Sequence, residues 1–127
     1  MPRRHLDWMK QADRDFKHAE GSLKLGDFEW SCFAAQQAAE KAIKALIESR
    51  NGKAFGHSIK KLLELLNVTD ETLLEAAARL DKHYIPTRYP NGYDSGAPEE
   101  YYSVKDAERA VKDAEAIIKY CKTNLVK

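Results

Sequence analysis

Apolar residues recur in steps of three and four along most of this chain, which is the period of an α-helix. Five segments carry the pattern, and their apolar positions run from Leu6 to Leu23, Cys32 to Leu46, Ile59 to Leu66, Leu73 to Tyr84 and Val104 to Leu125. β-branched residues are few and no alternating stretch is long, so no strand competes with these helices. The sequence therefore predicts an all-α protein, an antiparallel up-and-down helical bundle of about five helices.

Turn and capping residues separate the five segments. Gly26 and Asp27 predict a helix stop followed by a new N-cap, and Asn51-Gly52 ends the second helix. Thr69 is the expected cap of the fourth helix and Pro86 its expected end, while Ser103 opens a capping-box pattern before the last helix. With 127 residues and no shift in composition, residues 1–127 are expected to form a single helical domain.

The second segment is expected to be the central helix, because small side chains let neighbouring helices approach closely. Its apolar stripe is rich in alanine and alternates steps of three and four without a slip: Cys32, Ala35, Ala39, Ala42 and Leu46. Cys32 and Cys121 both occupy apolar helical positions, so we expect two buried, reduced thiols.

The charge balance excludes a global field that would draw the protein to nucleic acid or to a membrane. Lys and Arg number 21 against 20 Asp and Glu, a formal charge of +1. No apolar run approaches the length of a membrane span, and the Met-Pro-Arg-Arg-His start lacks the apolar stretch of a secretory signal. We therefore expect a cytoplasmic protein without membrane contact, whose charge-led binding is local.

The segment 83–102 gathers five of the six tyrosines and three of the four prolines, and from Pro86 to Tyr102 it has no helical period. Loops of this length in compact domains tend to be functional or disordered, and tyrosine rings argue against disorder. Each residue before a proline favours an extended conformation, so residues 85–90 are expected to form a stiff, strand-like arm. That arm would hold Arg88 beside three rings, those of Tyr84, Tyr89 and Tyr93.

A guanidinium grips phosphate through two parallel hydrogen bonds, and aromatic faces accept unstacked bases. This segment is therefore a candidate site for a phosphate-bearing ligand. The alternative is structural, with the tyrosines capping the end of the bundle and Arg88 pairing with Asp94 or Glu99.

A second candidate feature is the stretch 49–63, which carries four basic residues and no acid. The Gly-His-Ser sequence at 56–58 opens the third helix and would expose backbone N–H groups that favour an anion. Lys53, His57 and Lys60 could then face phosphates, although such a run is equally typical of a solvated surface.

Other chemistry is not indicated. The four histidines lack metal-ligand spacing, and no Gly-rich phosphate loop, GxSxG or HExxH motif is present, so we expect no metal and no cofactor. Glu40 stands apart from the other carboxylates because it lies in an alanine-rich stretch. We expect it to be partly buried and paired with Lys41 or Lys44.

Three parts of the sequence carry a family resemblance: Gln-Gln-Ala-Ala-Glu-Lys at 36–41, Gly56-His57, and Tyr84 followed by Arg88-Tyr89-Pro90. With the long alanine-spaced final helix, they resemble the HEPN family, the higher eukaryotes and prokaryotes nucleotide-binding domain. The resemblance covers nearly the whole chain. It implies a five-helix antiparallel bundle that commonly dimerises, with a site around the loop before the last helix.

Many HEPN proteins are metal-independent ribonucleases with an Arg-x4-6-His motif, and others pair with a small nucleotidyltransferase in toxin–antitoxin systems. This chain has no histidine after His83, so the motif lacks its histidine, and a tyrosine or serine transfers protons poorly near neutral pH. No catalytic residue is predicted firmly; Arg88 and His83 are the candidates, and His57 could also substitute.

The sequence thus favours a HEPN protein that binds nucleotide or RNA phosphate near Arg88, with contributions from Tyr84, Tyr89, Tyr93, His57, Lys53 and Lys60. It would be the partner of a small nucleotidyltransferase in a toxin-antitoxin-like pair, and a homodimer. Bulky residues off the core stripes, Trp8, Trp30 and Phe33, could supply the dimer surface. The alternatives are a metal-independent ribonuclease with a degenerate motif and a non-catalytic protein-interaction adaptor.

Overall fold

The protein is seen here in a computed structural model that describes residues 4–126. Within that range it is all helical, with no strand. The α-helices are α1 (His5–Leu25), α2 (Phe28–Ser49), α3 (Ile59–Leu65), α4 (Glu71–Asp81) and α5 (Val104–Asn124), and two 3₁₀ turns, η1 (Pro90–Gly92) and η2 (Pro98–Glu100), lie between α4 and α5. The predicted fold class is confirmed.

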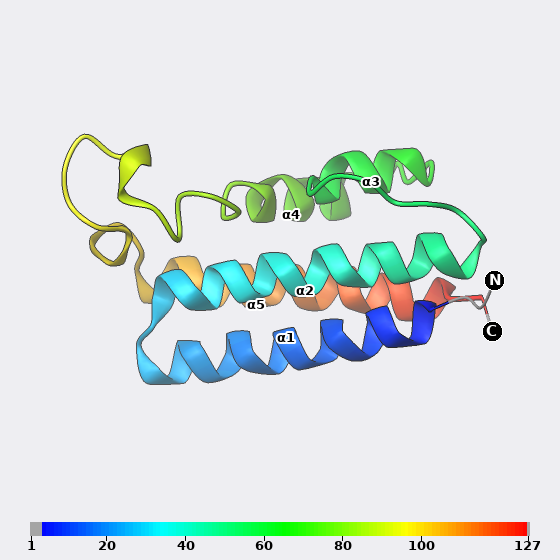
Figure 1. Cartoon of the computed structure of the whole chain (residues 1–127), viewed down its shortest axis with the longest axis horizontal. Helices are drawn as coiled ribbons and strands as arrows, with labels where there is room; N and C mark the ends of the chain where they lie inside the picture. Colours follow the sequence, from blue (N-terminus) through cyan, green and yellow to red (C-terminus); the bar gives the residue numbers. More distant parts are fainter. Residues whose placement is uncertain (1–3, 127) are drawn as a thin grey trace.

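Helices α1, α2, α4 and α5 alternate in direction along the chain, which makes the bundle up-and-down (Figure 1). The short α3 lies beside α4 on one side of α2, and α1 and α5 lie on the other sides. Helix α2 contacts each of the other four α-helices, so it is the central helix as its alanines predict.

The core forms around the predicted stripe of α2. Every member of that stripe is fully buried, and it packs against apolar faces of the other helices, represented by Ala12, Ile59, Leu63, Leu80 and Ile117. Both thiols are buried and unpaired with each other, as expected. Burial raises the pKa of Cys32 and of Cys121 to about 12, which keeps both as neutral thiols.

The turn between α1 and α2 follows its sequence signal. Gly26 has φ 83°, a left-handed conformation that glycine adopts without strain, and its N–H bonds to the carbonyl of Leu23 at 3.2 Å. Asp27 occupies the N-cap position of α2, but its side chain accepts no capping hydrogen bond. At α5 the predicted capping box is present in full, between Ser103 and Asp106.

Helix α4 differs from the prediction at both ends. Asp70 is its cap, accepting from the N–H groups of Thr72 and Leu73, so the expectation of a Thr69 cap was one residue early. The helix ends at Asp81, before Tyr84. The first part of the arm expected at residues 85–90 is a turn, closed by Arg88 N–H to Ile85 O at 3.0 Å, whereas Tyr89 has the extended conformation expected before Pro90. This turn buries Thr87, whose hydroxyl donates to the carbonyl of His83 at 2.7 Å.

The segment between α4 and α5 projects at one end of the bundle as an irregular loop (Figure 1). Its own side chains hold it together. The rings of Tyr93 and Tyr101 stack at 4.0 Å between centroids, the Tyr93 hydroxyl donates to Pro86 O at 3.1 Å, and the Tyr101 hydroxyl donates to Ser95 O. The tyrosines therefore order this loop, as their number predicted.

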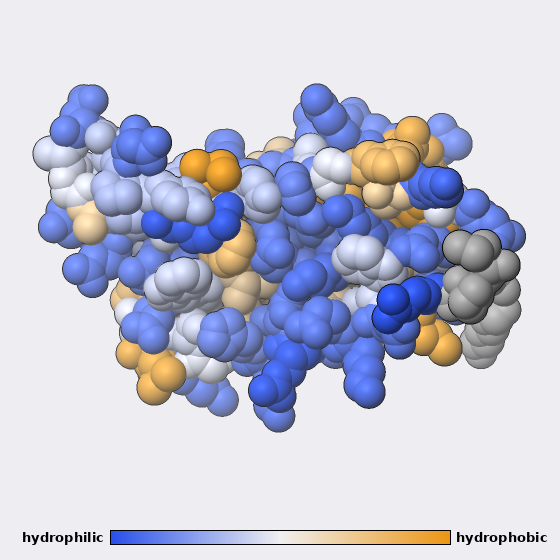
Figure 2. Space-filling model, in the orientation of Figure 1, coloured by the Kyte–Doolittle hydropathy of each residue, from blue (hydrophilic) through white to orange (hydrophobic). Residues whose placement is uncertain are grey.

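In the described part of the chain, none of the helices combines the length and the apolar character needed to cross a bilayer. The face seen in Figure 2 is mostly hydrophilic, with small apolar patches that are separate from one another.

Candidate functional site

Arg88 lies among three aromatic rings, which come from two parts of the chain. Its guanidinium carbon is 4.2 Å from the ring centroid of Phe33 on α2, 4.9 Å from that of Tyr84 and 5.2 Å from that of Tyr89. A cation over ring faces is attracted by their π electrons, and the rings shield one side of it from water. We call Arg88, Phe33, Tyr84, Tyr89 and His57 the Arg88 site.

The orientation of Arg88 is fixed by its own chain. Its Nε and Nη2 both donate to the backbone carbonyl of Tyr84, at 3.0 and 2.6 Å. Within residues 4–126 no carboxylate pairs with it, so the alternative pairing with Asp94 or Glu99 is not formed. The site therefore presents an oriented positive charge without a protein counter-ion.

His57 joins the Arg88 site through Tyr84. Their rings stack with centroids 4.4 Å apart at an interplanar angle of 18°. The Nδ1 atom of His57 lies 3.1 Å from Oε2 of Glu40, a residue that is only 5% exposed. Because this carboxylate holds Nδ1, the Nε2 atom is the one left for a ligand or a proton.

Glu40 is the centre of a hydrogen-bond network along α2. Its carboxylate accepts from Lys44 Nζ at 3.0 Å and from Gln36 Nε2 at 3.0 Å, in addition to its contact with His57. The predicted pairing with Lys44 is confirmed, whereas Lys41 pairs with Asp15 instead. The network anchors the loop that carries His57 to the central helix.

Two members of this region, Phe33 and Gln36, were not among the predicted site residues. The signal that finds them is helical spacing, because residues 33, 36, 40 and 44 recur in steps of three and four and share a face of α2 next to the core stripe. A bulky ring followed by three polar side chains on one face of a buried helix indicates a face that lines a binding site.

The structure brings some predicted residues together and leaves others apart. Arg88, Tyr84, Tyr89 and His57 form one cluster. Tyr93 stacks on Tyr101 and makes no ring contact with Arg88. Two lysines, Lys53 and Lys60, are exposed, and within the described residues no hydrogen bond or ion pair joins either side chain to the cluster.

The N-terminus of α3 does not offer the free N–H groups that the sequence suggested. Asp81 accepts hydrogen bonds from the N–H groups of Ile59, at 2.7 Å, and Lys60, at 3.2 Å, and from the hydroxyl of Ser58, at 2.9 Å. An anion site is present there, but a carboxylate of the same chain fills it.

His83, the other candidate histidine, lies on the α5 side of the loop. Its ring packs edge-on against Tyr102 at 5.6 Å, and its Nδ1 is buried without a hydrogen-bond partner. Burial lowers the pKa of His83, with Asp106 and Asp113 opposing the shift. Beside it Arg79 donates two hydrogen bonds to the buried Asp113, so the charges of that region are compensated.

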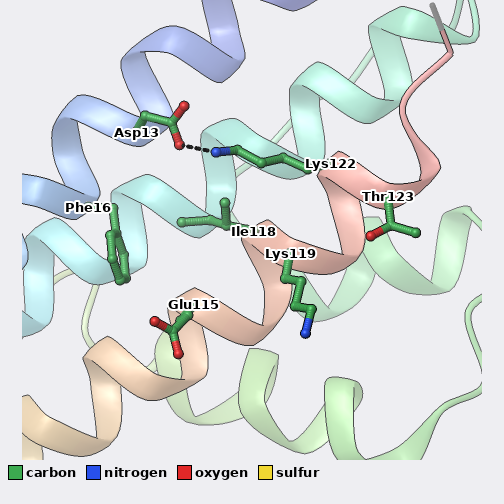
Figure 3. Close-up of a pocket in the computed structure, with 7 residues that line it drawn as sticks. All are labelled: Asp13, Phe16, Glu115, Ile118, Lys119, Lys122 and Thr123. Carbon is green, nitrogen blue, oxygen red and sulfur yellow. Dashed lines mark ion pairs between the residues drawn. The ribbon is translucent and has the colours of Figure 1, made fainter.

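Cavities lie along α1 on both of its packed sides. One, of about 300 Å³, lies between α1 and α5, where Phe16 and Ile118 form the floor and Asp13 pairs with Lys122 at 2.8 Å (Figure 3). It contains none of the predicted site residues. Another, of about 210 Å³, lies between α1 and α2 and shares Phe33 with the Arg88 site. In residues 4–126 no three His, Cys, Asp or Glu side chains are grouped as metal ligands.

The chain is similar to several known proteins over almost its full length. A solved structure of a Thermus thermophilus protein is 43% identical, with a TM-score of 0.89 over 98% of this chain and 100% of that one. A structure described as an archaeal HEPN homologue is 39% identical, with a TM-score of 0.83 over 98% of this chain and 99% of that one.

A HEPN domain protein from Thermotoga maritima is 36% identical, with a TM-score of 0.74 over 92% of this chain and 95% of that one. A Methanocaldococcus jannaschii protein named as a candidate toxin is 28% identical over 128 aligned positions, which cover 91% of this chain and 84% of that protein. The HEPN domain profile matches residues 5–124. The chain therefore belongs to the HEPN domain family.

Proposed function

We propose that this HEPN protein binds the phosphate of a nucleotide or of RNA at the Arg88 site. The observation that carries the proposal is the guanidinium of Arg88, which has no carboxylate partner among the described residues. It lies over the rings of Phe33 and Tyr84 and donates to the backbone carbonyl of Tyr84. Oriented arginine is well suited to bind phosphate, and aromatic faces nearby suit a base.

The residues of the site have separate roles in this proposal. Arg88 donates to phosphate oxygens. Tyr89 is 47% exposed and offers a ring face to a base. When the His57 ring is protonated, its Nε2 provides a second donor beside Tyr84. Within residues 4–126 no hydrogen bond, ion pair or ring contact joins Tyr93, Lys53 or Lys60 to the cluster. We therefore assign Tyr93 no direct role and the two lysines a long-range contribution to the local potential.

The test is a titration of the protein with ATP and with a short single-stranded RNA, using Arg88→Ala and Arg88→Lys. We expect both ligands to bind at least tenfold more weakly to Arg88→Ala, since a charge-assisted pair is lost, and Arg88→Lys to recover part of the affinity. Arg14→Ala removes an exposed arginine of α1 as the matched control. Equal affinity of the wild type and Arg88→Ala would contradict the proposal.

The protein is further proposed to act in the cytoplasm as a homodimer and as the toxin-like member of a pair with a small nucleotidyltransferase. The HEPN family membership and the name of the Methanocaldococcus relative support a toxin-like role. Co-expression of the chain with a nucleotidyltransferase from an adjacent gene, followed by co-purification, tests the pair. Sedimentation at several concentrations tests the homodimer, and a strict monomer would contradict it.

A second candidate function is metal-independent RNA cleavage, favoured by the contact of His57 with Glu40. A carboxylate that holds Nδ1 orients a histidine for proton transfer at Nε2, and Arg88 lies against the same tyrosine ring. The same geometry does not favour His83, which faces Tyr102. The test is to incubate labelled RNA in chelator with the wild type, His57→Gln and His83→Gln. Loss of cleavage in His57→Gln alone supports this function, and no cleavage by the wild type excludes it.

A further inference from the structure

The cavity between α1 and α2 opens beside the Arg88 site, and the ring of Phe33 belongs to both. The guanidinium of Arg88 lies over this ring, and the same ring lines the cavity together with Trp30, Ala34 and Gln37. Phe33 is therefore the residue that the cavity wall and the Arg88 site have in common.

The shape of the cavity suits one flat ring system. Trp30 and Phe33 meet with centroids 6.2 Å apart and planes at 77°, so they form a corner in which a planar group can stack on one ring and present its edge to the other. The volume of about 210 Å³ is below the roughly 300–1,000 Å³ of sites for drug-sized ligands. It fits a base and leaves the sugar and phosphate outside.

The charges of the cavity favour an uncharged occupant. Lys41 and Asp15, which both line it, form an ion pair with each other. The guanidinium of Arg88, in the neighbouring site, has no carboxylate partner in the described part of the chain. A phosphate is therefore expected at Arg88 and a neutral base in the cavity, with His18 at the α1 side of the wall.

The chain of amides along α2 determines what Gln37 offers to that base. A carboxylate such as Glu40 accepts hydrogen bonds, so Gln36 must present Nε2 to it and Oε1 to its neighbour. Gln37 therefore donates its Nε2 to Gln36 Oε1, at 2.8 Å. Its Oε1 accepts no hydrogen bond within residues 4–126, so it is available to accept one from a ligand.

From these four observations we propose that the α1–α2 cavity is the base subsite of the Arg88 site, in which a nucleobase stacks in the Trp30–Phe33 corner and donates an N–H to Gln37 Oε1. This inference rests on the proposed function, since it places the phosphate at Arg88. It adds the position of the base, its class as an N–H donor, and a role for Gln36 and Glu40 as positioning residues that set the Gln37 amide.

Calorimetric titrations with three ligands test the subsite on the unmodified protein: AMP, purine riboside monophosphate, which lacks only the amino group of AMP, and ribose 5-phosphate, which lacks the base. We expect purine riboside monophosphate to bind about three- to tenfold more weakly than AMP, the value of one hydrogen bond. Ribose 5-phosphate is expected to bind roughly tenfold or more weakly, because base stacking is lost.

Gln37→Leu removes the acceptor, so the preference for AMP over purine riboside monophosphate should disappear in that variant. Asn124→Leu removes a side-chain amide from α5, where Asn124 bonds to the carbonyl of Tyr120 away from the cavity, and should keep the preference. In a Trp8→Phe background Trp30 is the remaining tryptophan, and AMP should change its fluorescence while ribose 5-phosphate should not.

The outcomes separate the inference from the function on which it rests. Equal binding of AMP and ribose 5-phosphate, both weakened by Arg88→Ala, would overturn the base subsite and leave phosphate binding in place. Absence of Arg88-dependent binding by every ligand would overturn both. A hexamer of adenylate, titrated in parallel, distinguishes RNA from free nucleotide as the source of the base, because RNA binding should exceed that of AMP and show the same loss in Gln37→Leu.

Discussion

Glu40 shows at the scale of one residue how a buried charge is accommodated. Its side chain is 7% exposed, yet it is compensated by Lys44, itself 12% exposed, by the Gln36 amide and by His57. A buried carboxylate is tolerated when it is paired and hydrogen-bonded, and removing one partner leaves the others unsatisfied. The cost of losing Glu40 is therefore larger than the value of any single contact.

Glu40→Ala should lower the free energy of unfolding by about 3 kcal/mol, because it leaves the largely buried Lys44 ammonium without its acceptor and the Gln36 amide with only the His57 carbonyl. Urea unfolding followed by circular dichroism measures the change. Asp7→Ala breaks the exposed pair with Arg4 and should cost less than about 1 kcal/mol. If Glu40→Ala lowered the free energy of unfolding no more than Asp7→Ala, Glu40 would not be the buried centre of the network.

The lowered pKa of His83 makes a contribution to stability that depends on pH. Because the folded-state pKa lies below the ordinary 6.5, the unfolded chain takes up this proton first as the pH falls. Above pH 6.5 the ring is neutral in both states and adds no pH dependence. Between 6.5 and the folded-state pKa, each fall in pH favours the unfolded chain and lowers the free energy of unfolding.

As the pH falls below 6.5, the free energy of unfolding of His83→Leu should therefore fall less than that of the wild type, by up to about 1.4 kcal/mol per pH unit. Chemical unfolding at each pH gives the difference. His18→Leu, at an exposed position of α1, serves as the control and should follow the wild type. Parallel pH profiles of wild type and His83→Leu would refute the assignment.

At the scale of elements, α3 is notable because it is only seven residues long and still well defined. Helices this short are not stable alone, since nucleation costs more than a few hydrogen bonds return. Its support comes from the burial of Ile59, Leu62 and Leu63 and from Asp81, which caps α3 from the end of α4. The cap belongs to tertiary structure, although it acts on one helix end.

Asp81→Ala should destabilise the protein by about 1–2 kcal/mol, as the loss of a helix cap does, and Asp81→Asn should cost less because it keeps an acceptor. Thermal unfolding measures both. The faster exchange of the Ile59 amide hydrogen in Asp81→Ala is the local sign of the lost cap. Unchanged exchange at Ile59 would show that the amide is protected by another group.

At the scale of the whole molecule, the two thiols report whether the bundle opens as a unit. Cys32 on α2 and Cys121 on α5 are both fully buried, and burial raises the pKa of each to about 12. A reagent that needs the thiolate can reach neither in the folded state.

We expect no labelling of native protein by a disulfide reagent on the time scale in which a free cysteine reacts, and labelling of both thiols in denaturant. Under native conditions the two should react slowly and at the same rate, because both are exposed by global unfolding. Mass spectrometry of the labelled chain gives the two rates. Rapid native labelling of either thiol would show that its helix end opens locally.

The sequence predicted most of the elements because their signals are local. The stripe from Cys32 to Leu46, the left-handed Gly26 and the capping box at Ser103 each depend on neighbours within a few residues, and each is found where it was predicted. The loop was predicted less well. The preference of residues before proline predicts an extended arm at residues 85–90, and Tyr89 is extended, but at residues 85–88 the burial of Thr87 and its hydrogen bond to His83 O outweigh that preference and form a turn.

By itself the sequence determined the helices and their central member, since periodicity and composition act along the chain, and it made Arg88 the candidate centre of a site. Only the tertiary structure decided which groups meet there. Packing α2 against the turn after α4 places Phe33 under Arg88, and the Glu40 carboxylate holds His57 beside Tyr84, while Asp81 fills the N-terminus of α3. These contacts join residues far apart in the chain, and their geometry follows from how the helices pack, which no local pattern specifies.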